Sequence, residues 1–378
     1  MNRRFKYQAL LSLITLGLAS CASEPSHTKA PPPAANKSRA VQIAPVLSEP
    51  LAQLPSYGAQ RISGDYAGYP ALNQFIDGMV SQHGFSREYL NAVFSKAKRK
   101  QWTLDYLSKE TGSAGGGPRP GAWSRYRAQF LTELHINSGA EFWRQHADSL
   151  QRASKKYGVP PEYILGIMGV ETVFGRNVGK HRVIDALTTL AFDYPRRGSY
   201  FAGELEKFLL MVRAEKIDPL TPEGSYAGAM GLGQFMPSSF LQWAVDFNGD
   251  GARNLWQADD VIGSIANYFA EHGWHHDEAV VTPALATGTQ IEDLEVGFDS
   301  HYDIYKLNQL GIKATAQLPS PNDIHLLRLR ASQGDQYWLG HHNFYVITRY
   351  NHSTHYAMAV HELAQAIKQR YLANIAAR

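Results

Sequence analysis

The chain has 378 residues, of which 44% are hydrophobic and 19% charged, so it is an ordinary globular protein with room for two or three domains. Its formal net charge of +3 at pH 7 neither requires nor excludes a polyanionic partner. Because no run of Lys and Arg is interleaved with aromatic residues, we expect no nucleic-acid groove, and the densest basic run, KAKRK at 96–100, is typical of a solvated helix face.

The N-terminus predicts export. Basic residues precede the apolar run ALLSLITLGLA at 9–19, which is too short to cross a bilayer as the helix of a folded domain. We therefore interpret residues 1–20 as a secretory signal peptide.

The signal ends in LASC, which resembles the lipobox of bacterial lipoproteins, where the cysteine is acylated and becomes the mature N-terminus. In that family's sorting pattern, Ala22 in place of Asp implies the outer membrane. We therefore expect a lipid anchor at Cys21, on the periplasmic face of the outer membrane. The alternative is an ordinary cleaved signal with a chance cysteine after it. Cys21 is the only cysteine, so no internal disulfide is possible.

The next segments predict a tether and then a helical region. Residues 21–65 are rich in Pro, Ala and Ser and contain few aromatic residues, which predicts a disordered tether. From Tyr69 onward the apolar residues follow a helical spacing, interrupted by a glycine-rich loop at 111–123. We interpret 66–157 as a helical domain.

The segment YILGIMGVETVFGR at 163–176 carries a glutamate among apolar and small residues. Helical spacing places Glu171 on the same face as Ile164, Ile167 and Met168, where an apolar side chain is expected. Burial penalises a charged carboxylate, so its pKa rises and it remains a proton donor near neutral pH. The alternatives are a buried glutamate paired with Arg or Lys, or a helix that exposes this position.

Polar and aromatic residues gather in three later segments. DYPRRGSYF at 193–201 and RYNHSTHYAMAV at 349–360 combine side chains that suit sugar rings, whose apolar faces stack while their hydroxyls form hydrogen bonds. The glycines of GSYAGAMGLGQFMPSSF at 224–240 fit neither the dinucleotide nor the P-loop spacing. This loop suits either a polar ligand held against backbone amides and Gln234, or a packing turn between helices.

DFNGDGARNLWQADD at 246–260 begins as a calcium-binding loop does, with oxygen-bearing side chains at its first, third and fifth positions and glycine at the sixth. Gln257 at the twelfth position cannot provide the usual bidentate carboxylate, but Asp259 or Asp260 would close a longer loop. A single loop of this kind predicts a structural ion rather than a sensor, and the alternative is a solvated turn.

The last third changes character. AVVTPA at 279–284, HLLRLR at 325–330 and NFYVITRY at 343–350 predict strands of a small sheet, and 356–372 returns to a helical period. The chain contains no HExxH motif and no GxSxG motif, so we assign neither a zinc site nor a serine-hydrolase site.

Together, and in order, GVETVFGR, LTTLAFDYPRRGSYF, GSYAGAMGLGQFMPSSF, AVDFNGDGARNLW, IGSIANYFAEHGW and RYNHSTHYAMAV closely resemble the membrane-bound lytic murein transglycosylase B family, the family 3 lytic transglycosylases. The resemblance covers about residues 70–378. It implies a mainly α (α+β) fold with three domains: a lysozyme-like core over 158–279, a helical domain over 66–157 completed by 346–378, and a small β domain over 280–345.

The resemblance also implies the activity: cleavage of the β-1,4 bond between N-acetylmuramic acid and N-acetylglucosamine in peptidoglycan, leaving a 1,6-anhydromuramoyl end. Its catalytic glutamate falls on Glu171, acting as acid and then as base. The implied sugar-contacting residues are Tyr126, Arg196, Arg197, Tyr200, Ser225, Gln234, Phe235, Tyr268, Tyr350, Asn351 and Tyr356. The implied calcium ligands are Asp246, Asn248, Asp250, the backbone carbonyl of Ala252, and Asp260.

Two other functions stay open at this stage. A hydrolytic muramidase would use Glu171 with a second, water-activating carboxylate, for which Asp185, Asp193 and Glu204 are the candidates. A non-catalytic peptidoglycan-binding lipoprotein would bind glycan without product. We expect a monomer without an organic cofactor, whose partners are glycan strands, the membrane and possible envelope proteins.

Overall fold

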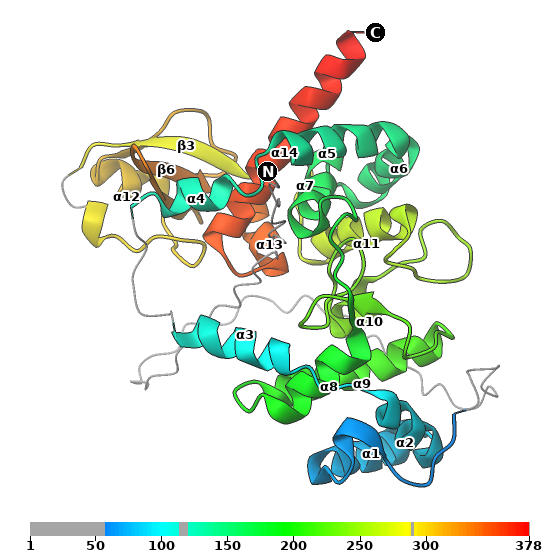
Figure 1. The fold of residues 1–378 in the computed structure, drawn as a ribbon. Coiled ribbons are helices and arrows are strands. Elements are labelled where there is room, and N and C mark those ends of the chain that lie inside the picture. Colours follow the sequence, from blue (N-terminus) through cyan, green and yellow to red (C-terminus); the bar gives the residue numbers. More distant parts are fainter. Residues whose placement is uncertain (1–56, 113–119, 289–290, 378) are drawn as a thin grey trace, which may run out of the picture.

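The structure is a computed structural model that describes residues 57–112, 120–288 and 291–377, so the signal peptide, Cys21 and most of the expected tether lie outside it. The chain is mostly helical with small antiparallel sheets, as expected (Figure 1). The helices are α1 Pro70–His83, α2 Arg87–Lys96, α3 Gln101–Gly112, α4 Ala122–Arg127, α5 Glu133–Gln145, α6 Ala147–Tyr157, α7 Pro161–Thr172, α8 Val183–Asp193, α9 Gly198–Ala214, α10 Pro237–Trp243, α11 Ala258–Glu271, α12 Ile304–Gln309, α13 His342–Tyr350 and α14 Thr354–Ala376. The strands are β1 His181–Arg182, β2 Glu223–Gly224, β3 Val281–Ala286, β4 Ile312–Ala314, β5 His325–Ala331 and β6 Gly334–Gly340. Within the described ranges, no helix is both long and apolar enough to cross a membrane.

The segment 57–65 is packed, although the sequence assigns it to the tether. The backbone N–H of Ala59 donates to the carbonyl of Glu88 on α2 at 2.9 Å, and the hydroxyl of Tyr57 donates to Asp218 at 2.9 Å. Tyr66, which follows, is fully buried. The predicted tether therefore extends too far, because the few aromatic residues at its end were too sparse to register as a pattern.

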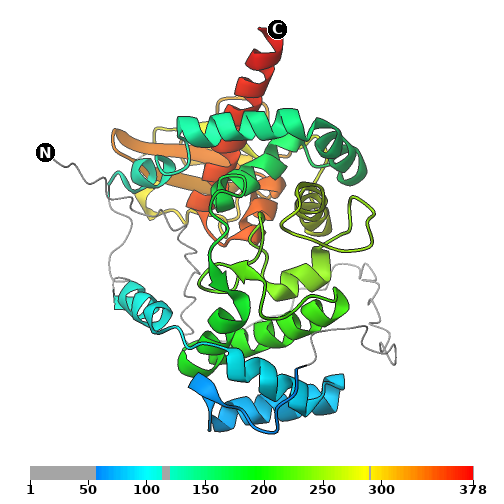
Figure 2. The same ribbon diagram turned by 45° about the vertical axis from the view of Figure 1, so that its right-hand side comes forward.

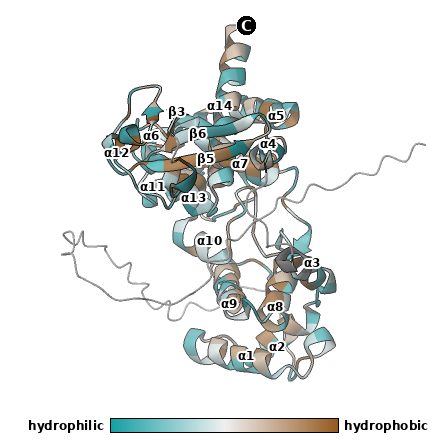
Figure 3. Cartoon of the chain, turned by 90° about the vertical axis from the view of Figure 1, so that its left-hand side faces the viewer, coloured by the Kyte–Doolittle hydropathy of each residue, from teal (hydrophilic) through white to brown (hydrophobic). Residues whose placement is uncertain are grey.

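The segment 66–157, expected to be one helical domain, is divided between two parts of the molecule (Figures 1 and 2). The segment up to α3 packs on α8: the backbone N–H of Lys98 donates to Asp185, and the side chain of Arg99 to Asp193. In contrast, α5 packs on α14 and α7, and α6 packs on α11. α8 is apolar along most of its length, with 183–190 entirely buried (Figure 3). Helices that follow one another in the sequence, such as α3 and α5, therefore pack in different parts of the molecule.

The small sheet has the strand order β4-β3-β6-β5, and all of its pairs are antiparallel. Two of the predicted strands correspond to β3 and β5. The third prediction, a strand over 343–350, is wrong, because this segment is α13. Its residues 343, 344 and 346–348 are buried, while the half-buried His342, Tyr345 and Arg349 share another face of the helix. Its β-branched and aromatic side chains are typical of strands, which explains the wrong prediction. The sequence does not predict β6, because this strand contains Gly, Asp and Gln, and glycine and aspartate are uncommon in strands.

The packing of α14 on α7 explains the two glycines in the middle of α7. A Cβ atom on Gly166 would lie 2.8 Å from the backbone carbonyl oxygen of Val360 on α14, and one on Gly169 would lie 2.7 Å from a methyl carbon of Leu363. Both contacts are shorter than real side chains allow. The glycines thus cost helix propensity, about 1 kcal/mol each, but allow two helices distant in sequence to approach closely.

Candidate active site

Glu171 lies in the last turn of α7 and is only 8% exposed. The helix begins at Pro161, where the fixed backbone of proline suits the first helical position. All residues from 162 to 172 are buried, so the carboxyl group is surrounded by the apolar interior of the molecule. The expected position of Glu171 on an apolar face is confirmed.

The turn that follows Glu171 is strained. Val173 and Phe174 have φ angles of 50° and 56°, in the left-handed region that non-glycine residues rarely adopt and β-branched residues avoid. Hydrogen bonds hold the turn: Val173 N donates to the Gly169 carbonyl at 3.1 Å, and Gly175 N donates to the hydroxyl of Thr172 at 3.1 Å. Such strain persists only where the surroundings enforce it, and here it ends the helix directly after the carboxylate.

Thr172 connects this turn to the glycine-rich loop over 224–240. Its hydroxyl donates to the backbone carbonyl of Leu232 at 2.9 Å. Sequence reasoning did not single out Thr172, and the only signal for it was its position next to Glu171. The hydrogen bond sets the end of α7 against the loop that carries Gln234.

Burial raises the pKa of Glu171 from 4.5 to about 7, while a hydrogen bond from Tyr356 opposes this by lowering it. The hydroxyl of Tyr356 on α14 donates to Oε1 of Glu171 at 2.5 Å. A cation paired with Glu171 would instead dominate and depress the pKa, so the raised value argues against the interpretation as a structural ion pair. At neutral pH the carboxyl group is therefore divided between its protonated and ionised forms.

Three of the expected sugar-contacting tyrosines surround the carboxyl group. Burial raises the pKa of Tyr126, Tyr350 and Tyr356, and the negative charge of Glu171 raises each of them further. They come from α4, the end of α13 and the first turns of α14. The hydroxyl of Tyr350 donates to the carbonyl of Gly233 at 2.6 Å, which ties α13 to the glycine-rich loop.

Phe235 and Tyr268 form an aromatic cluster with Tyr350. The ring of Phe235 lies 5.9 Å from that of Tyr268 and 5.8 Å from that of Tyr350, measured between centroids, and the two tyrosine rings are 4.9 Å apart. The hydroxyl of Tyr268 donates to the carbonyl of Arg349 at 2.6 Å. Phe235 and Tyr268 are only 2% and 6% exposed, so most of their surface packs against other side chains and little of it is open to a ligand.

Ser225 and Gln234 hold the glycine-rich loop in shape. The hydroxyl of Ser225 accepts the backbone N–H of Ala229 at 3.0 Å. Gln234 has a φ angle of 52°, and its amide nitrogen donates to the carbonyls of Gly231 at 2.9 Å and Val178 at 3.2 Å. Its amide oxygen accepts none of the hydrogen bonds found in the described ranges, and the residue is half-buried.

Four of the residues expected to contact sugar make no contact with the carboxyl group of Glu171 among the described residues: Arg196, Arg197, Tyr200 and Asn351. Arg197 and Tyr200 lie at the start of α9, where the guanidinium carbon is 4.3 Å from the centre of the tyrosine ring, and Arg196 is exposed beside them. Tyr200 is 40% exposed. Asn351 ends α13, and its carbonyl accepts the backbone N–H of Ser353 at 2.7 Å.

All three candidates for a second carboxylate have structural partners. Asp185 is fully buried and forms an ion pair with Lys100 at 3.0 Å, in addition to its backbone contact with the segment before α3. Asp193 accepts the side chain of Arg99 at 3.0 Å. Glu204 accepts both the backbone N–H and the hydroxyl of Ser238, at 2.9 and 2.7 Å, which joins α9 to α10. Each carboxylate is therefore used to fix helices in place.

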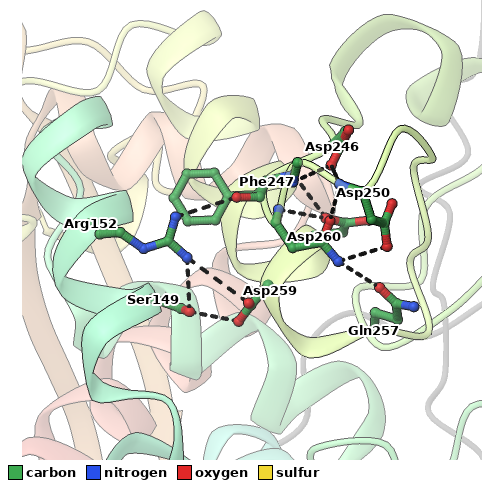
Figure 4. Close-up of polar contacts among 10 residues, drawn as sticks. Ser149, Arg152, Asp246, Phe247, Asp250, Gln257, Asp259 and Asp260 are labelled. Atoms are coloured by element: carbon green, nitrogen blue, oxygen red, sulfur yellow. Dashed lines mark hydrogen bonds and ion pairs between the residues drawn. The ribbon is translucent and has the colours of Figure 1, made fainter.

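The loop over 246–260 is organised by its own carboxylates (Figure 4). Asp246 accepts the backbone N–H groups of Gly249 and Gly251 at 2.6 and 2.8 Å. Asp260 is fully buried and accepts the N–H of Phe247 and of Asn254, both at 2.8 Å, so it closes the loop. Asp259, the other candidate for closure, instead accepts the hydroxyl of Ser149 on α6 at 2.6 Å.

The donor set of this loop contains oxygen atoms only, from Asp246, Asn248, Asp250 and Asp260, as calcium prefers. In the described part of the chain, no three His, Cys, Asp or Glu side chains lie close enough to hold a metal by themselves. A calcium site here therefore needs the amide oxygen of Asn248 and a backbone carbonyl such as that of Ala252. With these two additional oxygen atoms, the loop provides a set of donors that fits calcium.

Two grooves flank the site. One, with a volume of about 480 Å³, lies along α5 and includes Phe174 and Arg176 from the turn after Glu171. The other, about 770 Å³, lies between α4 and strands β3 and β6 and is lined by Trp123 and Trp338 among others. Glu171 lines neither groove.

The chain is similar to known proteins along most of its length. The family described as "Transglycosylase SLT domain" matches residues 68–365. The membrane-bound lytic murein transglycosylase B of Escherichia coli K12 is 46% identical over 366 residues, which cover 96% of this chain and 97% of that protein. The solved Escherichia coli lytic transglycosylase SLT35 in complex with calcium is 50% identical, with a TM-score of 0.78 over 82% of this chain and 97% of that one. SltB3 from Pseudomonas aeruginosa in complex with NAG-anhNAM-pentapeptide is 26% identical, with a TM-score of 0.68 over 78% of this chain and 79% of that one.

The raised pKa of Glu171 predicts a pH-dependent cost in stability. Between about pH 4.5 and 7 the unfolded chain releases this proton while the folded protein retains it, so the free energy of unfolding falls as pH rises. Glu171→Gln removes this titration. We expect the stability gain of this variant over the wild type to be about 3 kcal/mol larger near pH 8 than near pH 4, measured by urea denaturation.

Tyr356→Phe provides the second arm of this experiment. It removes the hydrogen bond that lowers the pKa of Glu171, so the pKa rises further and the loss of stability between the two pH values becomes larger. An identical difference between Glu171→Gln and the wild type at both pH values would contradict the buried, protonated carboxyl group.

Proposed function

This chain belongs to the SLT transglycosylase family and is a lytic transglycosylase of peptidoglycan, and we propose that Glu171 is its single acid and base. In this proposal it cleaves the β-1,4 bond between N-acetylmuramic acid and N-acetylglucosamine and leaves a 1,6-anhydromuramoyl end. The observation that supports this most directly is the buried carboxyl group with a pKa of about 7. A group that must both give and take a proton works best near the ambient pH.

In the first step, protonated Glu171 donates its proton to the glycosidic oxygen, and the bond from that oxygen to the anomeric carbon of the muramoyl residue breaks. The N-acetyl group of the same sugar supports the positive charge that develops at the anomeric carbon. The N-acetylglucosamine leaves with a free hydroxyl group. The hydrogen bond from Tyr356 stabilises the carboxylate that Glu171 has become.

In the second step, the carboxylate of Glu171 removes the proton from the 6-hydroxyl of the muramoyl residue, and that oxygen forms the bond to the anomeric carbon. Glu171 ends protonated again, so the cycle balances. The attacking hydroxyl belongs to the same sugar, and an intramolecular reaction has a large advantage over attack by water. A hydrolase would need a second carboxylate to activate water, and Asp185, Asp193 and Glu204 are all held by structural partners.

We propose that the residues around Glu171 hold the two sugars. Gln234 would offer its amide oxygen to a sugar N–H or hydroxyl, and Tyr126 and Tyr350 would contact a sugar bound beside the carboxyl group. The other proposed contacts are Ser225, Phe235, Tyr268, Asn351 and Tyr356. Arg196, Arg197 and Tyr200 at the start of α9 would contact a more distant part of the substrate.

Mass spectrometry of muropeptides released from purified sacculi tests the activity. The wild-type chain in detergent should release products one water lighter than the reducing species. Glu171→Gln should lower the rate by at least about a thousandfold, because general acid and base catalysis are both lost, while binding to sacculi persists. Asp193→Asn is the control, since that carboxylate is paired with Arg99 and is expected to take no part in the chemistry. Reducing ends alone would replace this proposal with a hydrolase.

We propose that the loop over 246–260 binds a structural calcium ion, as the solved relative in complex with calcium does. Asp246, Asn248, Asp250, the carbonyl of Ala252 and Asp260 would supply the oxygen ligands, and the bound ion would neutralise the carboxylates gathered in this loop. The ion lies outside the chemistry of the sugar.

Calcium should therefore raise the melting temperature. A concentration about 100-fold above Kd adds about 2.7 kcal/mol to the free energy of unfolding, and a chelator should remove this gain. Asp250→Ala is the control variant, in which calcium and chelator should give the same melting temperature. If the melting temperature of the wild type did not change when chelator was added, this would contradict the calcium site.

We also propose that Cys21 is acylated and anchors the chain to the periplasmic face of the outer membrane. The support is the LASC sequence and the relative that is described as membrane-bound. Fractionation of cells that express Cys21→Ser should move the chain from the membrane pellet to the soluble fraction. A variant that still sediments with membranes in high salt would contradict the lipid anchor.

A further inference from the structure

An exposed aromatic cluster lies on α3, outside the site described above. Trp102 is 48% exposed, whereas the other six tryptophans of the chain are buried or half-buried. Its ring is nearly parallel to those of Tyr106 and His181, with centroids 5.3 and 5.7 Å away and interplanar angles of 17° and 16°. We call Trp102, Tyr106 and His181 the α3 cluster. Trp102 supplies the exposed surface of the cluster, and Tyr106 and His181 are half-buried beside it.

The α3 cluster rests directly on the loop that carries Ser225 and Gln234. Tyr226, which is 3% exposed, meets Trp102 edge-on at 6.0 Å and Tyr106 at 5.1 Å. His181 in β1 is paired with Gly224 in β2, the residue just before Ser225. The cluster and the glycine-rich loop therefore form one continuous structure.

The N-terminal end of α3 is fixed in position. The backbone N–H of Lys100 donates to the hydroxyl of Thr189 on α8 at 3.0 Å, and the side chain of Lys100 pairs with the buried Asp185 at 3.0 Å. Thr103, the next residue after Trp102, is fully buried. Trp102 is thus presented on a rigid support, which lowers the entropy lost when a ligand packs on it.

The chemistry of the cluster favours an uncharged ligand with an apolar face. Burial, followed by the charge of Lys100, lowers the pKa of His181, so its ring is neutral at neutral pH like those of Trp102 and Tyr106. Sugar rings have this character, because one face carries mostly C–H groups that pack against aromatic rings while the hydroxyls point outward to water. A charged peptide has no ionic partner within the cluster.

We propose that the α3 cluster binds a sugar ring of the same glycan strand, beyond the two sugars at the cleaved bond. This inference rests on the proposed function, since it takes the substrate to be a polymer that extends past Glu171. The cluster packs on Tyr226, the neighbour of the proposed sugar contact Ser225, and this proximity is the support for assigning it to the same strand. Tyr200, also exposed and on a helix that packs on α8, lies on the same part of the molecule.

The test compares strands of different length. Peptide-free glycan strands of about four and about twelve sugars are given to the full chain in detergent, and the ratio of kcat/KM for long over short strands is measured. Trp102→Ala should lower this ratio about fivefold, the scale of one aromatic stacking contact. Trp102→Phe, which keeps a ring, should retain most of the ratio. Leu372→Ala removes another exposed apolar side chain, 53% exposed on α14, and should leave the ratio at its wild-type value.

Binding provides an independent readout. In Glu171→Gln, the long strand should shift the tryptophan emission to shorter wavelength, and Glu171→Gln combined with Trp102→Phe should lose this shift. An equal loss of kcat/KM on both lengths, or an unchanged ratio in Trp102→Ala, would overturn the proposal and leave the cluster a structural role. If the wild type released only reducing ends, the proposed function would fail, while the emission shift would still decide whether the α3 cluster binds glycan.

Discussion

The close packing of α14 on α7 is the constraint on which the site depends. It removes the carboxyl group of Glu171 from water and brings Tyr356, from the far end of the chain, within 2.5 Å of it. This approach is possible only because Gly166 and Gly169 leave room for the backbone and side chains of α14. The raised pKa is thus a property of the tertiary structure, since α7 by itself would leave Glu171 in solvent with an ordinary carboxyl group.

Three chain segments are then locked to one another around that carboxyl group. Thr172 binds the carbonyl of Leu232, Tyr350 binds the carbonyl of Gly233, and the strained turn at Val173 ends α7 at the right point. Both hydrogen bonds link segments that are distant in sequence, and each joins a side-chain hydroxyl of one segment to a backbone carbonyl of the other. A rigid frame of this kind keeps catalytic groups oriented before substrate binds, which is where much of the rate advantage of an enzyme arises.

The sequence predicted the parts of this arrangement that leave a local pattern. Glu171 was found because helical spacing placed it among apolar residues, and the mostly helical fold with a small sheet was expected from the resemblance. The helix α13 was mistaken for a strand because its β-branched and aromatic residues are typical of strands. Thr172 and Trp102 could not be assigned, because their importance lies in contacts with Leu232 and His181, and a single sequence does not reveal which distant residues meet.

In the proposed mechanism, the opposition of two forces at Glu171 lets one carboxyl group serve as both acid and base. Burial alone would raise its pKa until the carboxylate rarely formed, which would leave no base for the second step. A paired cation would depress the pKa until the protonated acid was rare, which would leave no donor for the first. The neutral hydroxyl of Tyr356 lies between these extremes: it favours the carboxylate by one hydrogen bond without adding charge, so the pKa settles at about 7. Asp185, Asp193 and Glu204 are held by their own partners, so the proposed mechanism assigns both proton transfers to this balance at Glu171.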